Sequence, residues 1–318
     1  MGYTGRVTAF NRLAQLLRRK SAEVPTLAAP APVPAAARFT AATFSNPAGS
    51  RAYKLYEPAG RATGPRPLLV MLHGCTQDPD DFAAGTRMNE LADRHGLLVA
   101  YPAQASAANG MRCWNWFEAR DQIRDQGEPS LIAGIVSEIA AGGAIDPARI
   151  YVAGLSAGGA MALILAETYP ELFAAVGVHS GLPFGAARSA ASALGAMQGG
   201  FGAGPPVVPG GAAVRTIVFH GDADATVNCR NGEEIVRQAV AREQAAHGTL
   251  RVTTVTETTS GRRHTRTVYR GAETQPLVEY WQIEGAGHAW SGGSSRGSYA
   301  DEAGPDASAE MVRFFSEL

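Results

Sequence analysis

Three residues that can together activate a hydroxyl group occur in the order serine, aspartate, histidine along this chain of 318 residues. Ser156 lies in the pentapeptide Gly154-Leu155-Ser156-Ala157-Gly158, between the apolar run 150–153 and a segment suited to a helix. A serine at a sharp strand-to-helix turn points its hydroxyl away from the sheet, and flanking glycines remove β-carbons that would clash there. We predict that Ser156 is a nucleophile. The alternative interpretation is an ordinary turn rich in Gly and Ser.

The acid and base that such a serine requires follow two later apolar runs. His288 lies between small residues after the run 278–283, and Asp222 and Asp224 both follow the run 216–219. In open parallel sheets the chemistry is placed in loops at the carboxyl ends of strands. We therefore expect His288 to be the base. Asp224 is favoured as the acid because it lies deeper in its loop, whereas Asp222 suits a turn, and this choice also depends on the resemblance given below.

A tetrahedral oxyanion needs two N–H donors that are already in place. Ala157 follows the serine at the positive end of the expected helix, so its N–H is one candidate. The second is the N–H of Cys75, because Gly74 before it allows the backbone to approach closely. Three other histidines at the ends of apolar runs are interpreted as structural: His73, His179 and His220.

Alternating apolar runs and helical patterns predict a mostly parallel α/β sheet flanked by helices. The expected buried strands are 67–72, 97–101, 150–153, 174–179, 216–219 and 278–283. Paired strands are expected at 39–44 with 51–57 and at 252–258 with 265–269. Helices are expected at 88–94, around 132–139 with Ser130 as a candidate cap, at 232–246, and at the end of the chain with Asp306 as a cap.

The first 37 residues are predicted to lie outside the main domain, which we place at 38–318. Apolar residues recur at helical spacing within 7–20, and prolines and alanines follow in 25–37, as in a stiff extended linker. The helix 7–20 is a candidate contact for a partner, a polymer surface or a lipid. The alternative is a frayed extension or a helix packed on its own domain. Residues 182–211 are interpreted as a loop or lid.

Composition narrows the function classes. The formal net charge is -1 and 18% of residues are charged, so the chain lacks the excess of basic residues that is typical of nucleic-acid binding. This charge balance favours a neutral or weakly charged substrate. No His and Cys spacing suggests zinc, and we expect no metal or cofactor. No apolar run has the length of a transmembrane segment, and the N-terminus lacks a secretory pattern, so the default expectation is cytoplasmic.

These motifs together resemble the polyhydroxybutyrate (PHB) depolymerase family of esterases, whose relatives include feruloyl and acetylxylan esterases. The matching stretches are 72–77, 113–117, 154–161, 220–224 and 287–290. The resemblance implies an α/β-hydrolase fold, a triad of Ser156, Asp224 and His288, and hydrolysis of esters of hydroxy acids or aromatic acids. Many members are secreted, which makes an extracellular location an alternative to the default. No polymer-binding domain is evident, which favours short-chain or oligomeric esters.

The sequence allows alternative roles for the tryptophans and the cysteines of the loops. Trp114, Trp116 and Trp290 either line a substrate cleft or fill the core. Cys75 and Cys113 either form a disulfide that braces the oxyanion loop, as expected in an oxidising compartment, or remain reduced along with Cys229. An ester hydrolase is the favoured function. A serine peptidase and a non-catalytic binding protein are the alternatives.

Overall fold

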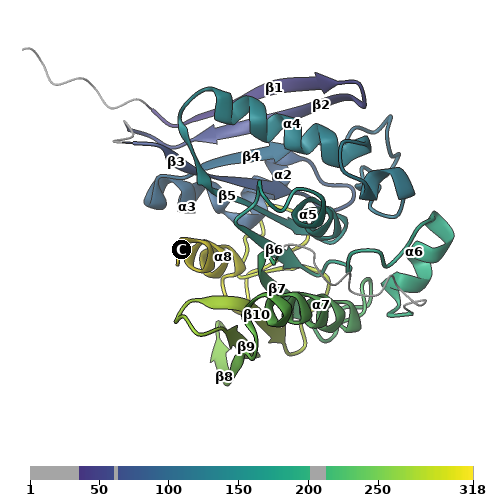
Figure 1. Cartoon of the computed structure of the whole chain (residues 1–318), viewed down its shortest axis with the longest axis vertical. Coiled ribbons are helices and arrows are strands. Elements are labelled where there is room, and N and C mark those ends of the chain that lie inside the picture. Colours follow the sequence, from purple (N-terminus) through teal and green to yellow (C-terminus); the bar gives the residue numbers. More distant parts are fainter. Residues whose placement is uncertain (1–35, 61–63, 201–212, 318) are drawn as a thin grey trace, which may run out of the picture. The chain divides into compact units, whose positions relative to one another are not determined.

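Ten strands form one sheet in the order β1-β2-β4-β3-β5-β6-β7-β10-β9-β8 (Figure 1). The computed structural model describes residues 36–60, 64–200 and 213–317, which belong to one compact unit. The strands are β1 (Arg38–Asn46), β2 (Gly49–Glu57), β3 (Arg66–Leu72), β4 (Leu98–Pro102), β5 (Ile145–Leu155), β6 (Ala175–His179), β7 (Arg215–Gly221), β8 (Arg251–Thr259), β9 (Arg262–Arg270) and β10 (Pro276–Ile283). The predicted helix 7–20, most of the linker 25–37 and part of the segment 182–211 lie outside the described residues.

The middle of the sheet is parallel and its two ends are antiparallel. Strands β4, β3, β5, β6, β7 and β10 run parallel to one another, whereas β1 and β2 at one end and β9 and β8 at the other are joined by antiparallel pairing. Strands β4, β6 and β7 are buried along their whole length, which is why their sequences are continuous apolar runs. The mostly parallel α/β sheet predicted from the sequence is confirmed.

Helices cover both faces of this sheet and enclose a core on each side. One core is formed with α4 (Gly127–Ala141), α5 (Ala157–Thr168) and α7 (Arg230–His247), and α6 (Ala190–Met197) adds two alanines to it. The other is formed with α2 (Pro79–Thr86), α3 (Met88–His95) and α8 (Ala307–Ser316). The remaining short elements are the 3₁₀ helix η1 (Ala119–Gln122), β11 (Trp290–Ser291) and β12 (Ala300–Asp301). Among the described residues no helix is both long and apolar enough to cross a bilayer.

Helix caps show one correct and one wrong prediction. Asp306 caps α8 by accepting a hydrogen bond from the N–H of Ala309 at 2.9 Å. Ser130 does not cap α4, because that helix begins earlier, at Gly127. The N–H of Glu128 in its first turn donates instead to Asp121, a residue outside the helix, at 2.7 Å. The carboxylate of Asp121 thus satisfies the N–H of Glu128, and the residue at the N-cap position of α4 makes no side-chain cap bond.

Candidate active site

Ser156 has the strained backbone expected at the end of β5. Its φ of 56° and ψ of -120° are values that a non-glycine residue rarely adopts. Glycine is required beside it, because a β-carbon on Gly158 would lie 2.0 Å from the carbonyl oxygen of Leu72. A β-carbon on Gly154 would lie 2.4 Å from the backbone of Gly158. The turn predicted from the pentapeptide is therefore formed, with α5 starting directly after the serine.

Asp224 and His288 form a buried pair. The Nδ1–H of His288 donates to Oδ2 of Asp224 at 2.7 Å, and the side chains are 12% and 0% exposed, respectively. The second oxygen of Asp224 accepts the N–H groups of Thr226 and Val227, both at 2.9 Å. Burial by itself raises the pKa of Asp224, but the hydrogen bond and charge of His288 and the bond from Val227 outweigh it, so that this pKa lies below its ordinary value. Asp224 is thus an ionised acceptor that orients the histidine ring.

Asp222, the competing acid candidate, has a different position. Its Oδ1 accepts the N–H of Gly285 at 2.6 Å, which ties the end of β7 to the loop that carries His288. His220 donates from Nε2 to the carbonyl oxygen of Val227 at 2.8 Å and lies 3.6 Å from Asp224. Both residues therefore support the loop geometry, as expected from the sequence, and Asp224 is the aspartate that contacts His288.

His179 connects the serine turn to the histidine loop. Its carbonyl oxygen accepts the N–H of Ser156 at 2.9 Å, and its ring Nε2 accepts the N–H of Ser291 at 3.0 Å. Burial lowers the pKa of His179 to about 3, so the ring is neutral. The structure does not join the serine hydroxyl to His288 by a hydrogen bond, and within the described residues this hydroxyl has no partner. Such bonds often tighten only when substrate binds.

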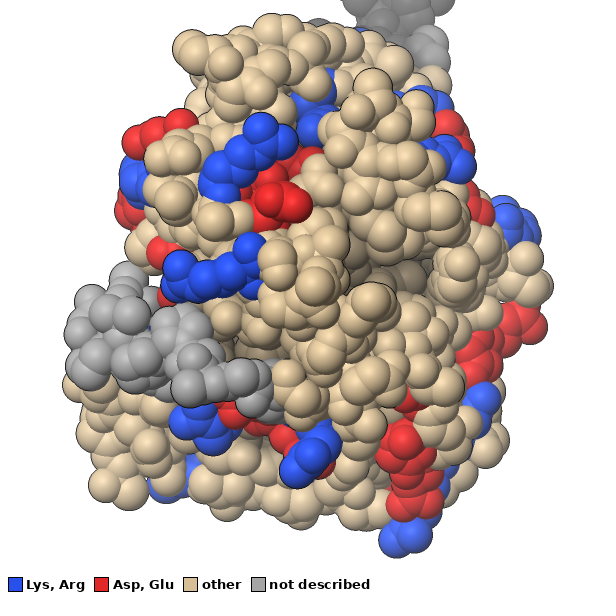
Figure 2. Space-filling view, turned by 90° about the vertical axis from the view of Figure 1, so that its right-hand side faces the viewer, with Lys and Arg blue, Asp and Glu red and all other residues tan. Residues whose placement is uncertain are grey.

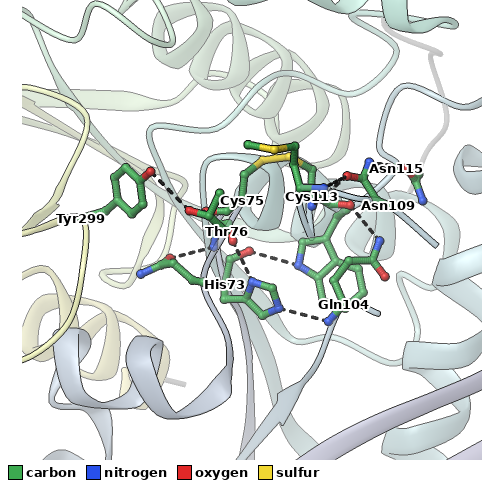
Figure 3. Close-up of a disulfide and its surroundings, with 12 residues drawn as sticks. His73, Cys75, Thr76, Gln104, Asn109, Cys113, Asn115 and Tyr299 are labelled. Carbon is green, nitrogen blue, oxygen red and sulfur yellow. Dashed lines mark hydrogen bonds between the residues drawn. A yellow bond between two sulfur atoms is a disulfide. The ribbon is translucent and has the colours of Figure 1, made fainter. Parts of the chain in front are cut away.

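The loop after β3 is fixed by a disulfide and by His73 (Figure 3). Cys75 is joined to Cys113, which leaves Cys229 as the free cysteine of the described part of the chain. His73 donates from Nδ1 to the carbonyl oxygen of Gly74 at 2.7 Å and accepts the N–H of Gln104 at 3.1 Å. Burial lowers the pKa of His73 to about 4. With both ring nitrogens engaged, His73 has the structural role expected for it.

The two candidate oxyanion donors lie on segments that are in direct backbone contact. Ala157 begins α5, so its N–H has no partner within the helix. Within the described residues no backbone acceptor is found for the N–H of Ala157 or Cys75. The close approach of Gly158 to Leu72 and His73 brings the first turn of α5 against the end of β3, immediately before Cys75. The first turn of α5 and the start of the Cys75 loop are therefore neighbours.

The three tryptophans lie in the core rather than on an open surface. Trp114 and Trp290 are 0% and 1% exposed, and their indole N–H groups donate to the carbonyl oxygen of His73 and to Ser308. The core-filling alternative therefore describes these two residues, and the proposed cleft contact is corrected for them. Trp116 is also buried but retains 6% exposure, next to Phe117.

A family model described as esterase PHB depolymerase matches residues 51–276. The chain belongs to the esterase PHB depolymerase family. Ser156 and Asp224 lie inside the matched range, whereas His288 lies beyond its end.

Two curated relatives show how far the resemblance to this family extends. Poly(3-hydroxyalkanoate) depolymerase C of Paucimonas lemoignei is 36% identical over 254 residues, which are 77% of this chain and 59% of the relative. Feruloyl esterase B of Neurospora crassa is 36% identical over 150 residues, 47% of this chain and 50% of the relative. The match therefore spans little more than half the length of these relatives.

A solved structure supports the fold of this PHB depolymerase family member. The acetyl xylan esterase from Aspergillus awamori superposes with a TM-score of 0.67 at 20% identity, covering 88% of this chain and 100% of that chain. At this identity the likeness concerns the fold, and the chain has the α/β-hydrolase fold that the sequence predicted.

One feature beside the site was not predicted. A buried polar network contacts the loop that contains Cys113. Both oxygens of Glu128 accept hydrogen bonds from Asn115, at 2.8 Å from its backbone N–H and 2.9 Å from its side chain. Gln104 also donates to Glu128, and Arg51 lies 3.5 Å from it. Burial raises the pKa of Glu128 despite these partners. A glutamate in the first turn of a helix looks like a surface residue in sequence, so no local pattern marks its burial.

Proposed function

We propose that this chain is a serine esterase that hydrolyses carboxylic esters through Ser156, His288 and Asp224. The observation that carries the proposal is the 2.7 Å bond between His288 and a buried, ionised Asp224, on the edge of the sheet where β5 ends in the strained Ser156. The membership of the family adds esters as the substrate class.

In the first step of the proposed reaction, the hydroxyl of Ser156 attacks the ester carbonyl while Nε2 of His288 takes its proton. Asp224 stabilises the imidazolium that forms, because its carboxylate already accepts the opposite ring N–H. The N–H groups of Cys75 and Ala157 donate to the tetrahedral oxyanion. His288 then gives its proton to the leaving alcohol, and an acyl-enzyme remains.

In the second step, water takes the place of the alcohol. His288 removes a proton from this water, which attacks the acyl carbonyl, and the same two N–H groups stabilise the second oxyanion. Return of the proton to Ser156 releases the carboxylic acid. No metal or cofactor enters these steps, and their atoms and charges balance with water alone.

The substrate of this proposed esterase is an uncharged ester of a hydroxy acid or a short acyl chain. Figure 2 shows a face of the molecule on which residues other than Lys, Arg, Asp and Glu cover most of the surface, and the formal net charge of the chain is only -1. The relative named as a poly(3-hydroxyalkanoate) depolymerase favours hydroxyalkanoate oligomers or polyester. The feruloyl esterase relative favours plant cell-wall esters as the second candidate. Trp116, whose 6% exposure is the largest of the three site tryptophans, is retained as a proposed substrate contact.

The Cys75–Cys113 disulfide bears on where this esterase works. Disulfides persist in oxidising compartments and are rare in the cytosol. We therefore favour the extracellular alternative over the cytoplasmic default.

Hydrolysis of p-nitrophenyl acetate and butyrate by purified wild type and Ser156→Ala tests the proposal. We expect the variant to lose at least about 10³-fold in kcat, since the nucleophile is removed. Ser180→Ala is the matched control, because Ser180 also directly follows a strand, β6, and has a positive φ, of 49°. Equal rates for wild type and Ser156→Ala contradict the proposal. A panel of hydroxybutyrate oligomers, methyl ferulate and acetylated xylan then distinguishes the two substrate classes.

A further inference from the structure

Strand β8 is an edge of the sheet that the described part of the chain leaves uncovered. All nine residues of Arg251–Thr259 are exposed, and the strand pairs with β9 along one side. Val252 and Val255, on opposite faces of the strand, are 54% and 51% exposed. Figure 1 shows β8 at the periphery of the sheet. Alternate backbone N–H and C=O groups of β8 therefore face outward without a partner among the described residues.

Edge strands are normally protected by lysine, proline, a bulge, short length or a covering helix. Strand β8 contains neither Lys nor Pro, and its register with β9 has no shift. At nine residues it is longer than the common strand length of about 5–6 residues. The strand at the opposite edge, β1, differs in having a helix against it, since Phe44 packs on Gly134 of α4 and Asn46 bonds to Ser130, although most of its residues are exposed. Apart from the charged Arg251 and Glu257, β8 lacks these devices, which suits an edge that pairs with another strand.

The sequence of β8 is complementary to an antiparallel copy of itself. Arg251 and Glu257 lie the same number of residues before and after Thr254. A two-fold axis at Thr254 therefore places Arg251 opposite the partner's Glu257, and Glu257 opposite the partner's Arg251. Directly opposed side chains of antiparallel strands lie on one face with β-carbons about 4.5–5.5 Å apart, and opposite charges there are favourable. Both side chains are exposed, and the guanidinium of Arg251, which donates to the carbonyl oxygen of Gly271 at 3.5 Å, keeps further N–H donors for such a pair.

We propose that two copies of this chain associate through β8, antiparallel and centred on Thr254, so that the sheet continues from one copy into the other. The pairing satisfies the outward backbone groups of β8 and places β-branched residues opposite one another, Val252 facing Thr256 and Thr253 facing Val255. Strand β9 separates β8 from β10, which leads into the loop of His288, and β9 and β10 together separate it from β7 and the loop of Asp224. The dimer is detected by its mass, so its test does not depend on esterase activity or on the proposed catalytic residues.

Light scattering after size exclusion, on the whole chain at several concentrations, tests this interface. We expect wild type to reach twice the monomer mass of 33.2 kDa as its concentration rises. Glu257→Arg and Arg251→Glu each place like charges opposite one another, so each variant alone remains monomeric at concentrations that dimerise wild type. An equimolar mixture of the two variants, and the double variant, both restore the dimer because opposite charges face again. Glu273→Arg is the control, since Glu273 is exposed in a loop and the same charge change there leaves dimerisation intact.

Cysteine cross-linking tests the register. Thr254→Cys lies on the axis, so its two copies form an interchain disulfide under mild oxidation. Thr259→Cys lies on the same strand, but its two copies are ten residues apart along the paired strands, about 33 Å, and do not cross-link. Circular dichroism confirms that each variant is folded. A wild type that stays monomeric at all concentrations overturns the proposal, as does a dimer unaffected by either single charge reversal, or cross-linking of Thr259→Cys as fast as Thr254→Cys.

Discussion

Replacing Asp224 with asparagine tests whether its contact with His288 selects the ring tautomer that catalysis needs. The change keeps the size of the side chain and removes its charge. Two backbone N–H groups, from Thr226 and Val227, donate to Oδ1 of Asp224 at 2.9 Å, and they hold the amide oxygen of the new side chain in that position. The amide NH₂ then faces Nδ1 of His288, where the carboxylate oxygen was.

This orientation places two donors against each other, because Nδ1 of His288 donates a proton in the wild type. Turning the amide over would leave both backbone N–H groups without an acceptor, at a cost of about 1–3 kcal/mol each. The ring therefore changes tautomer, and Nδ1 becomes the acceptor. Nε2 then carries the proton and cannot accept one from Ser156. We expect kcat to fall about 10⁴-fold, the scale known for a trapped tautomer, which corresponds to about 5 kcal/mol of transition-state stabilisation.

The assay is the steady-state hydrolysis of p-nitrophenyl butyrate by Asp224→Asn and, as the matched control, by Asp222→Asn. The control retains an oxygen that accepts the N–H of Gly285, so we expect its kcat to remain within about threefold of wild type. KM should change little in either variant, since neither aspartate is placed against the substrate. The reasoning is refuted if Asp224→Asn keeps a kcat within tenfold of wild type, or if Asp222→Asn loses more activity than Asp224→Asn.

Three further predictions concern stability and the oxyanion loop. Burial lowers the pKa of His73 to about 4 and of His179 to about 3, so between pH 6.5 and these values the unfolded chain binds more protons and stability falls as pH falls. Each ring should remove about 2 kcal/mol from the free energy of unfolding between pH 8 and pH 5, and urea unfolding that is as stable at pH 5 as at pH 8 would contradict this. Replacing Cys75 and Cys113 together with alanine opens a loop with a sequence separation of 38, which lowers stability by about 4 kcal/mol. It should also lower kcat more than it raises KM, and an unchanged kcat would show that the disulfide does not position the Cys75 N–H. Gly158→Ala places a β-carbon 2.0 Å from the carbonyl oxygen of Leu72 and should abolish activity or soluble yield, whereas Gly110→Ala, with open space around it, should leave both unchanged.

The fold and the core of the site were predictable because their signals are local. Continuous apolar runs identify the parallel strands, and the residues that follow those runs meet at one edge of the sheet. The choice between Asp222 and Asp224 was also made from the sequence, but the reason for it is visible only in three dimensions. Asp224 is turned toward His288 because the N–H groups of Thr226 and Val227 hold its other oxygen.

The features that were missed depend on side-chain contacts that a local sequence pattern does not reveal. The start of α4 is displaced because Asp121, which lies outside the helix, accepts the N–H of Glu128. Whether Trp114 and Trp290 line a cleft or fill the core depends on the hydrogen-bond partners that their indole groups find. The alternating pattern of β8 predicted a strand but gave no sign that both of its faces are exposed. Local propensity does not contain this information.

The backbone contact between Gly158 and Leu72 has a consequence for how this protein can vary. A backbone-to-backbone contact, without an intervening side chain, sets the separation between the two proposed oxyanion donors. Substitutions of surrounding side chains can therefore change which ester is accepted while the distance between these donors stays constant. A mutational library for new substrates should leave the glycines of the serine turn untouched and diversify side chains instead.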